Sequence, residues 1–154
     1  MPSGGDDPGP LGLLTSLEPK DNQDRLEMIL KEATCAVGIF DDMGSKYRES
    51  QCHLGEVFSK LKQQNLFYVQ GRPGIRIGDT EVPSATTDVV IDERPFRAAV
   101  DARFDYAERL GKYQGSSVAV MTARPVSFER LVLWVDQLPK RGIALAPVSQ
   151  LLVQ

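Results

Sequence analysis

The chain has 154 residues, a length that suits one domain around one hydrophobic core. Hydrophobic residues make up 42% and charged residues 25%, which is typical of a soluble globular protein. The net charge of -3 argues against a nucleic-acid partner, and the absence of an apolar run of about 18 residues argues against a transmembrane segment. Because His53 is the single histidine, a histidine-rich metal site is excluded.

The first 18 residues are rich in Gly, Pro and Asp, and predict a loop or disordered segment ahead of a domain over residues 19–154. They contain no basic stretch followed by an apolar one, so we expect no signal peptide in this chain. Cys35 and Cys52 are too few for a disulfide scaffold and belong to no zinc-type motif.

The rest of the chain alternates between amphipathic helices and short apolar strands. We expect helices near residues 19–33, 54–61, 96–110 and 127–138, and strands at residues 35–40, 66–69, 87–92, 117–121 and 143–148, with a long connection over residues 70–86. The first strand is expected to be buried. The order implies right-handed crossovers and a mostly parallel sheet, open or partly closed into a barrel.

The fourth expected helix has a candidate N-cap and a candidate core face. Ser127 is a plausible N-cap because its hydroxyl can accept a backbone hydrogen bond. The residues expected to face inward are Phe128, Leu131, Val132, Val135 and Leu138.

Polar residues gather just after the expected strands, where reactive groups of parallel sheets usually lie. They are Asp41, Asp42 and Ser45; Gln70 and Arg72; Asp92, Glu93 and Arg94; Thr122 and Arg124; and Ser149. Such carboxylates and guanidiniums could bind a divalent cation or a hydroxyl-rich ligand. The alternative is structural: the aspartates would cap the helices that follow, and the arginines would be exposed loop residues.

Three other residues have a structural interpretation that competes with a functional one. His53 lies in a helical segment and is more typical of a surface or half-buried histidine than of a catalyst. Trp134 is expected to pack in the fourth helix, although a tryptophan at a rim could stack on a sugar. Cys52 has no evident activating partner.

Six motifs occur in an order and spacing that resemble a known family. They are DPGPLGLLTSL (7–17), GIFDDMGSKY (38–47), LFYVQGRPG (66–74), DVVIDERPFRAAVDA (88–102), VAVMTARPVSFERL (118–131) and RGIALAPVSQLL (141–152). Together they resemble the C-terminal portion of the divergent polysaccharide deacetylases, distant relatives of NodB-type carbohydrate esterases. The resemblance implies an α/β fold, a distorted (β/α) barrel-like, mostly parallel sheet that lacks its N-terminal strands here. It also implies a periplasmic or otherwise extracytoplasmic location.

Carried over residue by residue, the resemblance implies a metal site with changed ligands. Asp42 stands where many members have a histidine, Asp92 keeps an aspartate, and Thr122 replaces the histidine of a Gly-His-Pro motif. Asp42 and Asp92 would hold a divalent metal, zinc or manganese, and Asp41 would act as the catalytic base. The residues implied to hold the glycan substrate are Ser45, Arg72, Thr122 and Arg124.

The resemblance implies that the chain hydrolyses acetyl groups on a glycan in bacterial envelope carbohydrate metabolism. The changed histidine positions favour an alternative, a catalytically silent domain of the same fold that binds a glycan or a protein partner. A third possibility is an incomplete domain whose open sheet edge needs a partner or a second copy, as in a homo-oligomer.

Overall fold

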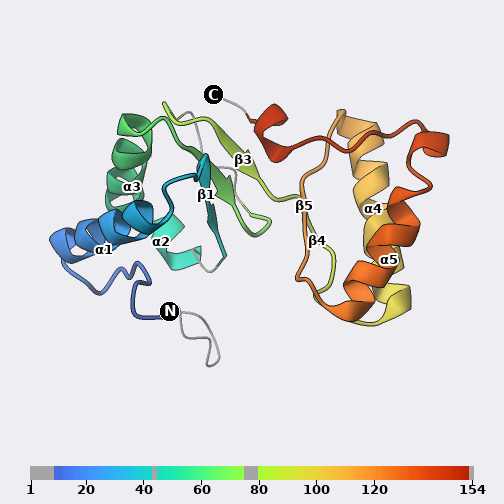
Figure 1. Cartoon of the computed structure of the whole chain (residues 1–154), viewed down its shortest axis with the longest axis horizontal. Helices are drawn as coiled ribbons and strands as arrows, with labels where there is room; N and C mark the ends of the chain where they lie inside the picture. The colour runs from blue at the N-terminus through green and yellow to red at the C-terminus, as the bar shows by residue number, and fades with distance from the viewer. Residues whose placement is uncertain (1–8, 43–44, 75–79, 153–154) are drawn as a thin grey trace. The chain divides into compact units, whose positions relative to one another are not determined.

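The computed structural model describes residues 9–42, 45–74 and 80–152. The chain divides into two compact units (Figure 1). Of the described residues, unit 1 contains 9–71 and 80–84, and unit 2 contains 72–74 and 85–152. Each unit has its own hydrophobic cluster, where the length of the chain suggested one core. In the part of the chain that the structure describes, no helix is long and apolar enough to cross a membrane.

Unit 1 places helices beside a small sheet in the order β1-β2-β3. Its elements are α1 (Pro19–Glu32), β1 (Gly38–Asp41), α2 (Ser45–Glu49), α3 (Gln51–Gln63) and β2 (Phe67–Gln70), with β3 (Ser84–Thr86) at the boundary between the units. Strands β1 and β2 are parallel, and Gly38 pairs with Phe67. A Cβ atom on Gly38 would lie 2.4 Å from the Phe67 ring, so a side chain there would have to displace that ring.

The core of unit 1 lies between α1, α3 and β2. Leu26 and Leu30 of α1 pack against Val57 and Leu61 of α3, and Leu61 is fully buried. The side chain of Asn22 exchanges two hydrogen bonds with the backbone of Leu14, of 2.8 and 3.0 Å, which ties the segment before α1 to that helix. Such pairing is what a buried amide requires.

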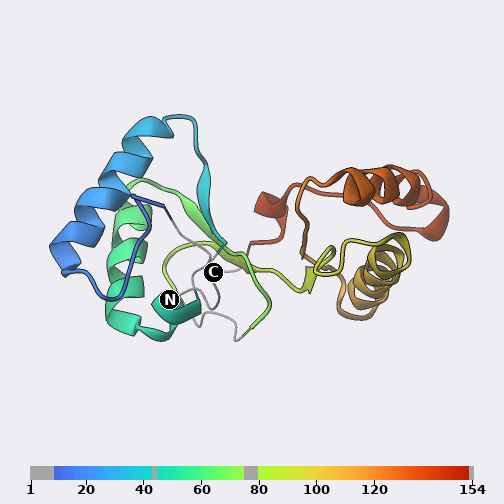
Figure 2. The ribbon, with the colours of Figure 1, turned by 90° about the horizontal axis from the view of Figure 1, so that it is seen from below.

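Unit 2 contains a two-stranded parallel sheet and two long helices that lie side by side (Figure 2). Its elements are β4 (Val89–Val90), α4 (Arg97–Gln114), β5 (Ala119–Val120), α5 (Pro125–Val135) and the 3-10 turns η1 (Pro139–Arg141) and η2 (Val148–Gln150). Val100 and Phe104 of α4 are buried against β4, and the Trp134 ring stacks on Phe104 at a centroid distance of 4.5 Å. Trp134 is therefore a packing residue.

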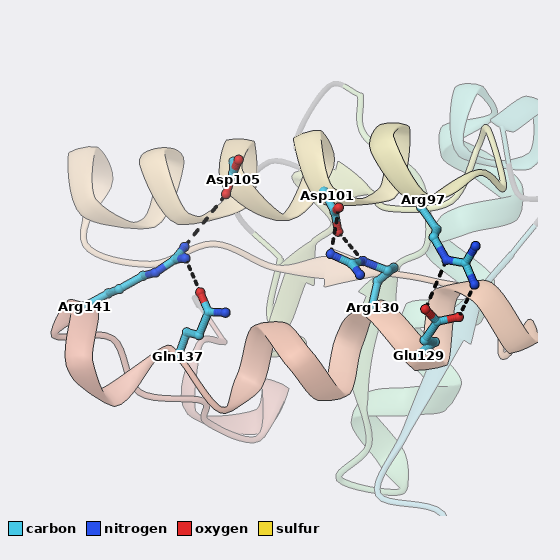
Figure 3. Close-up of polar contacts among 7 residues, drawn as sticks. All are labelled: Arg97, Asp101, Asp105, Glu129, Arg130, Gln137 and Arg141. Carbon is cyan, nitrogen blue, oxygen red and sulfur yellow. Dashed lines mark hydrogen bonds and ion pairs between the residues drawn. The ribbon is translucent and has the colours of Figure 1, made fainter.

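Ion pairs join α4 to α5 along their length (Figure 3). The guanidinium of Arg130 donates two hydrogen bonds to Asp101, of 2.6 and 2.8 Å, and Arg97 makes a similar pair with Glu129 at 3.0 Å. Bidentate pairs of this kind fix the relative rotation of two helices as well as adding a modest stabilisation.

The structure confirms the four predicted helices and corrects two details of the last. Helix α5 begins at Pro125, whose fixed φ suits a first helical position, so Ser127 lies inside the helix and is not the N-cap. Phe128 and Val132 were expected to face inward, but they are 57% and 56% exposed. Leu131 packs against the core of unit 2 and Leu138 is buried, as expected, and Trp134 joins Leu131 on the packed face.

Three strand predictions also need correction. The expected connection over residues 70–86 contains strand β3, held to β2 by the hydrogen bond from the Tyr68 N–H to the Pro83 carbonyl, 3.0 Å. Residues 143–148 do not form a strand, and Pro147 has no N–H for a sheet ladder. Strand β1 was expected to be buried, but it is the edge strand of its sheet, and Phe40 is 47% exposed.

Candidate functional site

The first candidate carboxylate, Asp41, closes strand β1 and accepts hydrogen bonds on both oxygens. Its Oδ1 accepts the backbone N–H of Gly71 at 2.6 Å. Its Oδ2 accepts Nη1 of Arg48 at 2.6 Å and the hydroxyl of Tyr68. The Asp41 and Arg48 side chains are only 14% and 15% exposed, so water screens this ion pair weakly.

This arrangement uses Asp41 to join β1, α2 and the end of β2. Burial, and then the hydrogen bond to Asp41, raise the pKa of Tyr68 well above its usual value, so its hydroxyl remains a donor. A Cβ atom on Gly71 would lie 1.9 Å from the Asp41 carbonyl oxygen, so the approach is possible only for glycine. A carboxylate paired with a guanidinium and two further donors is poorly placed to remove a proton from water.

The neighbouring candidates Asp42 and Ser45 lie beside this cluster in sequence. Asp42 is exposed directly after β1, and Ser45 begins α2. Residues 43–44, which match the family motif, lie outside the described residues. Asp42 is thus the more accessible of the two adjacent aspartates.

The second candidate carboxylate, Asp92, is buried in unit 2 at the end of β4, with 3% of its surface exposed. The backbone N–H of Thr122 donates to both of its oxygens, at 3.0 and 3.1 Å. The hydroxyl of Ser127 donates to Oδ2 at 2.7 Å, from a fully buried side chain. Asp92 does not cap α4, which has Phe96 as its N-cap and no side-chain cap bond.

Asp92 thereby positions two candidate binding residues on the surface. Thr122 and Arg124 follow β5, and both side chains are exposed. The Arg124 N–H donates to the Thr122 carbonyl at 2.7 Å, and Arg124 Nη1 reaches the Asp92 carbonyl oxygen at 3.5 Å. The structure thus brings Asp92, Thr122 and Arg124 together at one end of the β4–β5 sheet.

The other arginine, Arg72, is exposed in the bend after β2 and is grouped with unit 2, whereas Gln70 is buried at the end of β2. Asp41, Asp42 and Ser45 belong to unit 1. His53, the single histidine, shares a hydrogen bond of 2.6 Å between its Nδ1 and the Ser50 hydroxyl, which agrees with the structural interpretation.

The donors to the two aspartates were not predicted from the sequence. Arg48, Tyr68 and Gly71 surround Asp41, and Ser127 contacts Asp92. The orientation of Tyr68 could have been predicted in part, because side chains alternate along a strand and every second residue of β2 lies on the same face.

The carboxylates that the resemblance assigns to a metal do not fit that role well in either unit. Among the described residues, no group of three or more His, Cys, Asp or Glu side chains is close enough to hold an ion. The oxygens of Asp92 already accept hydrogen bonds from Thr122 and Ser127, and the group is out of reach of solvent. A cation there would have to displace those donors.

Residues 1–152 match the family described as divergent polysaccharide deacetylase. The chain belongs to the divergent polysaccharide deacetylase family. It is similar to the uncharacterized protein YibQ of Escherichia coli (strain K12), with 27% identity over 150 residues, covering 89% of this chain and 46% of YibQ. This confirms the resemblance found in the six motifs.

A solved structure confirms the fold class in its coarser form, an α/β fold with mostly parallel sheets. The crystal structure of the uncharacterized protein ATU2773 from Agrobacterium tumefaciens C58 matches with a TM-score of 0.84 and 24% identity. The match covers 97% of this chain and 63% of that chain. The chain thus spans less than two thirds of the length of either relative.

Proposed function

We propose that the chain binds a glycan at the exposed loop that follows β5, and that it does not hydrolyse the glycan by itself. The observation that carries the proposal is the burial of Asp92 beneath this loop, with its oxygens bonded to Thr122 and Ser127. The carboxylate then serves to hold the loop in place. Family membership supports a carbohydrate as the ligand.

The exposed groups of this loop suit a hydroxyl-rich ligand. The guanidinium of Arg124 presents several donors in a fixed plane, and the hydroxyl of Thr122 can donate and accept. Because Asp92 holds the backbone of Thr122, and the backbone N–H of Arg124 donates to the Thr122 carbonyl, the loop backbone is fixed before a ligand arrives, which lowers the entropic cost of binding. Ser45 and Arg72 remain proposed glycan-binding residues by family resemblance.

The second candidate function is metal-dependent deacetylation, which family membership supports. In that case Asp42 and Asp92 would hold zinc or manganese, and Asp41 would be the base. Bound metal would supply a polarised carbonyl and a water of lowered pKa. To bind the ion, Asp92 would have to give up its hydrogen bonds from Thr122 and Ser127. To act as a base, Asp41 would have to give up its pairing with Arg48.

A titration with chitotetraose, an N-acetylated oligosaccharide, distinguishes glycan binding from metal-dependent deacetylation. Amide chemical shifts of residues 121–125 would be followed by NMR, with and without EDTA, while released acetate is assayed. We expect the protein to bind chitotetraose equally well with and without EDTA and to release no acetate. The affinity for chitotetraose should be roughly tenfold weaker in Arg124→Ala. The matched control is Arg109→Ala, an exposed arginine of α4, which should bind normally.

Two results would contradict the glycan-binding proposal. One is the absence of any shift in a folded protein. The other is acetate release that stops when EDTA is added, which would establish the hydrolase instead.

We further propose that the chain acts in the bacterial envelope, in the periplasm or another extracytoplasmic compartment, and that its sheets form part of a distorted barrel. Family membership supports both statements. Fractionation of cells that produce the natural protein tests the location, and recovery in the cytosol alone would contradict it. A homo-oligomer that completes the sheet would appear as a doubled mass in light scattering.

A further inference from the structure

A polar cavity lies wholly within unit 1, and none of the candidate residues at the strand ends lines it. It has a volume of about 230 Å³ and is lined by residues of α1, α2 and α3. Buried Leu26 and Val57 contribute apolar surface, and Gln23, Ser59 and Gln63 contribute exposed amide and hydroxyl groups. Its size suits one small molecule and is too small for a drug-sized ligand.

Two of the charged groups that line this cavity are paired with each other, and a third is not. Nζ of Lys60 donates to Oε1 of Glu27 at 2.6 Å, so these two charges offset each other. Glu56 also lines the cavity, and its Oε2 is buried with no hydrogen-bond partner among the described residues. Oε2 itself is closed to water, and the rest of the half-buried Glu56 side chain is the part that a cation in the cavity can contact. A carboxylate that lacks a donor on one oxygen is stabilised by such a cation.

Tyr47 adds an aromatic group close to that carboxylate. Tyr47 and Glu56 line the same cavity, and burial, followed by the negative charge of Glu56, raises the pKa of Tyr47 to about 12. An aromatic face beside a carboxylate favours a cation, because the ring quadrupole and the negative charge both attract it. The net charge of the lining is negative once Glu27 and Lys60 are paired.

We propose that this cavity binds a small hydroxylated amine, with Glu56 as counter-ion of the ammonium group. The ammonium pairs with the accessible side of the Glu56 carboxylate beside Tyr47, and the hydroxyls of the ligand bond to the amides of Gln23 and Gln63 and to the hydroxyl of Ser59. An amino sugar or an amino alcohol carries this chemistry. The site is independent of the proposed glycan surface, which lies in unit 2.

The test is an NMR titration of the full chain with glucosamine, compared with glucose and N-acetylglucosamine at concentrations up to the order of 10 mM. We expect glucosamine to shift the amide resonances of α1 and α3, and the two uncharged sugars to bind at least about tenfold more weakly. Ethanolamine, an amino alcohol with no sugar ring, should shift the same resonances.

Glu56→Gln removes the charge while keeping the shape, and should weaken glucosamine binding by about tenfold or more. Glu49→Gln is the matched control, because Glu49 is an exposed residue of α2 outside the cavity. Circular dichroism establishes that both variants are folded, and Tyr47→Leu provides a second variant if Glu56→Gln is not.

Three outcomes would overturn the inference. If glucosamine causes no shifts in α1 and α3, the cavity holds water only. If glucose binds as well as glucosamine, or if the cavity variants bind normally, the ammonium is not what the site recognises. A failure of chitotetraose to bind at residues 121–125 would contradict the proposed function, but it would not change the result of the glucosamine titration.

Discussion

The buried hydroxyl of Ser127 donates a 2.7 Å hydrogen bond to Oδ2 of Asp92, and so joins the first turn of α5 to the end of β4. The same carboxylate accepts the N–H of Thr122, which lies between β5 and α5. One buried charge therefore fixes three segments of unit 2. It also explains why a serine, a poor residue for a helix interior, is found inside α5.

Replacing Asp92 by alanine should destabilise the fold. The change leaves the Thr122 N–H and the Ser127 hydroxyl buried without an acceptor, and we expect the free energy of unfolding to fall by about 3 kcal/mol. Ser127→Ala removes a single donor and should cost about 1–2 kcal/mol. Urea denaturation measures both. Glu93→Ala, which breaks an exposed ion pair with Arg103, is the control and should change stability by less than about 1 kcal/mol. An Asp92→Ala protein as stable as the wild type would show that the carboxylate is not a structural anchor.

The contacts of Asp41 should be energetically coupled. Tyr68→Phe removes the hydroxyl that donates to Oδ2, and we expect a loss of about 1–2 kcal/mol because the carboxylate is largely buried. A double-mutant cycle with Arg48→Met measures the coupling, since both donors share one oxygen. Strictly additive effects of the two substitutions would argue against a cluster held by Asp41.

Two glycine-to-alanine substitutions should have opposite effects. At Gly71, the new methyl would lie 1.9 Å from the Asp41 carbonyl oxygen and force the backbone apart, which should cost more than about 2 kcal/mol. At Gly55, inside α3, a methyl meets nothing within 4 Å, and alanine should stabilise the helix by up to about 1 kcal/mol. Thermal unfolding of the two variants compares them directly, and a Gly71→Ala protein with an unchanged Tm would contradict the close approach.

Stability should fall in alkali because two tyrosines hold their protons more tightly in the folded state. The pKa of Tyr47 is raised to about 12 and that of Tyr68 is raised as well, both chiefly by burial. A raised pKa means that the contribution to stability is complete below the unfolded pKa of about 10, and is lost between there and the folded pKa. Urea midpoints measured from pH 8 to 11.5 should therefore fall above pH 10. Tyr47→Phe should reduce the fall, and an unchanged slope in that variant would contradict the assignment.

The helices could be predicted from sequence because their signal is local. Apolar residues at helical spacing placed α1, α3, α4 and α5, and Pro125 could have fixed the start of α5. The partners of the strand-end acids could not be predicted, because they are distant in sequence. Ser127 lies 35 residues from Asp92, and Tyr68 lies 27 residues from Asp41.

The inward face of α5 shows a second limit of the sequence. Apolar residues occur nearly all round this helix, so periodicity alone could not separate Leu131 and Trp134, which pack, from Phe128 and Val132, which are exposed. The register of β3 was also beyond prediction, since three residues that follow a proline carry little strand signal.

The most direct measurement is a calorimetric titration of the metal-free protein with zinc and then with manganese, beside Asp42→Ala and Asp92→Asn. Because the oxygens of Asp92 already accept hydrogen bonds from Thr122 and Ser127, the account predicts no stoichiometric binding of micromolar affinity in the folded wild type. Stoichiometric binding that both substitutions abolish would contradict it, and would make the strand-end aspartates the metal site of a deacetylase.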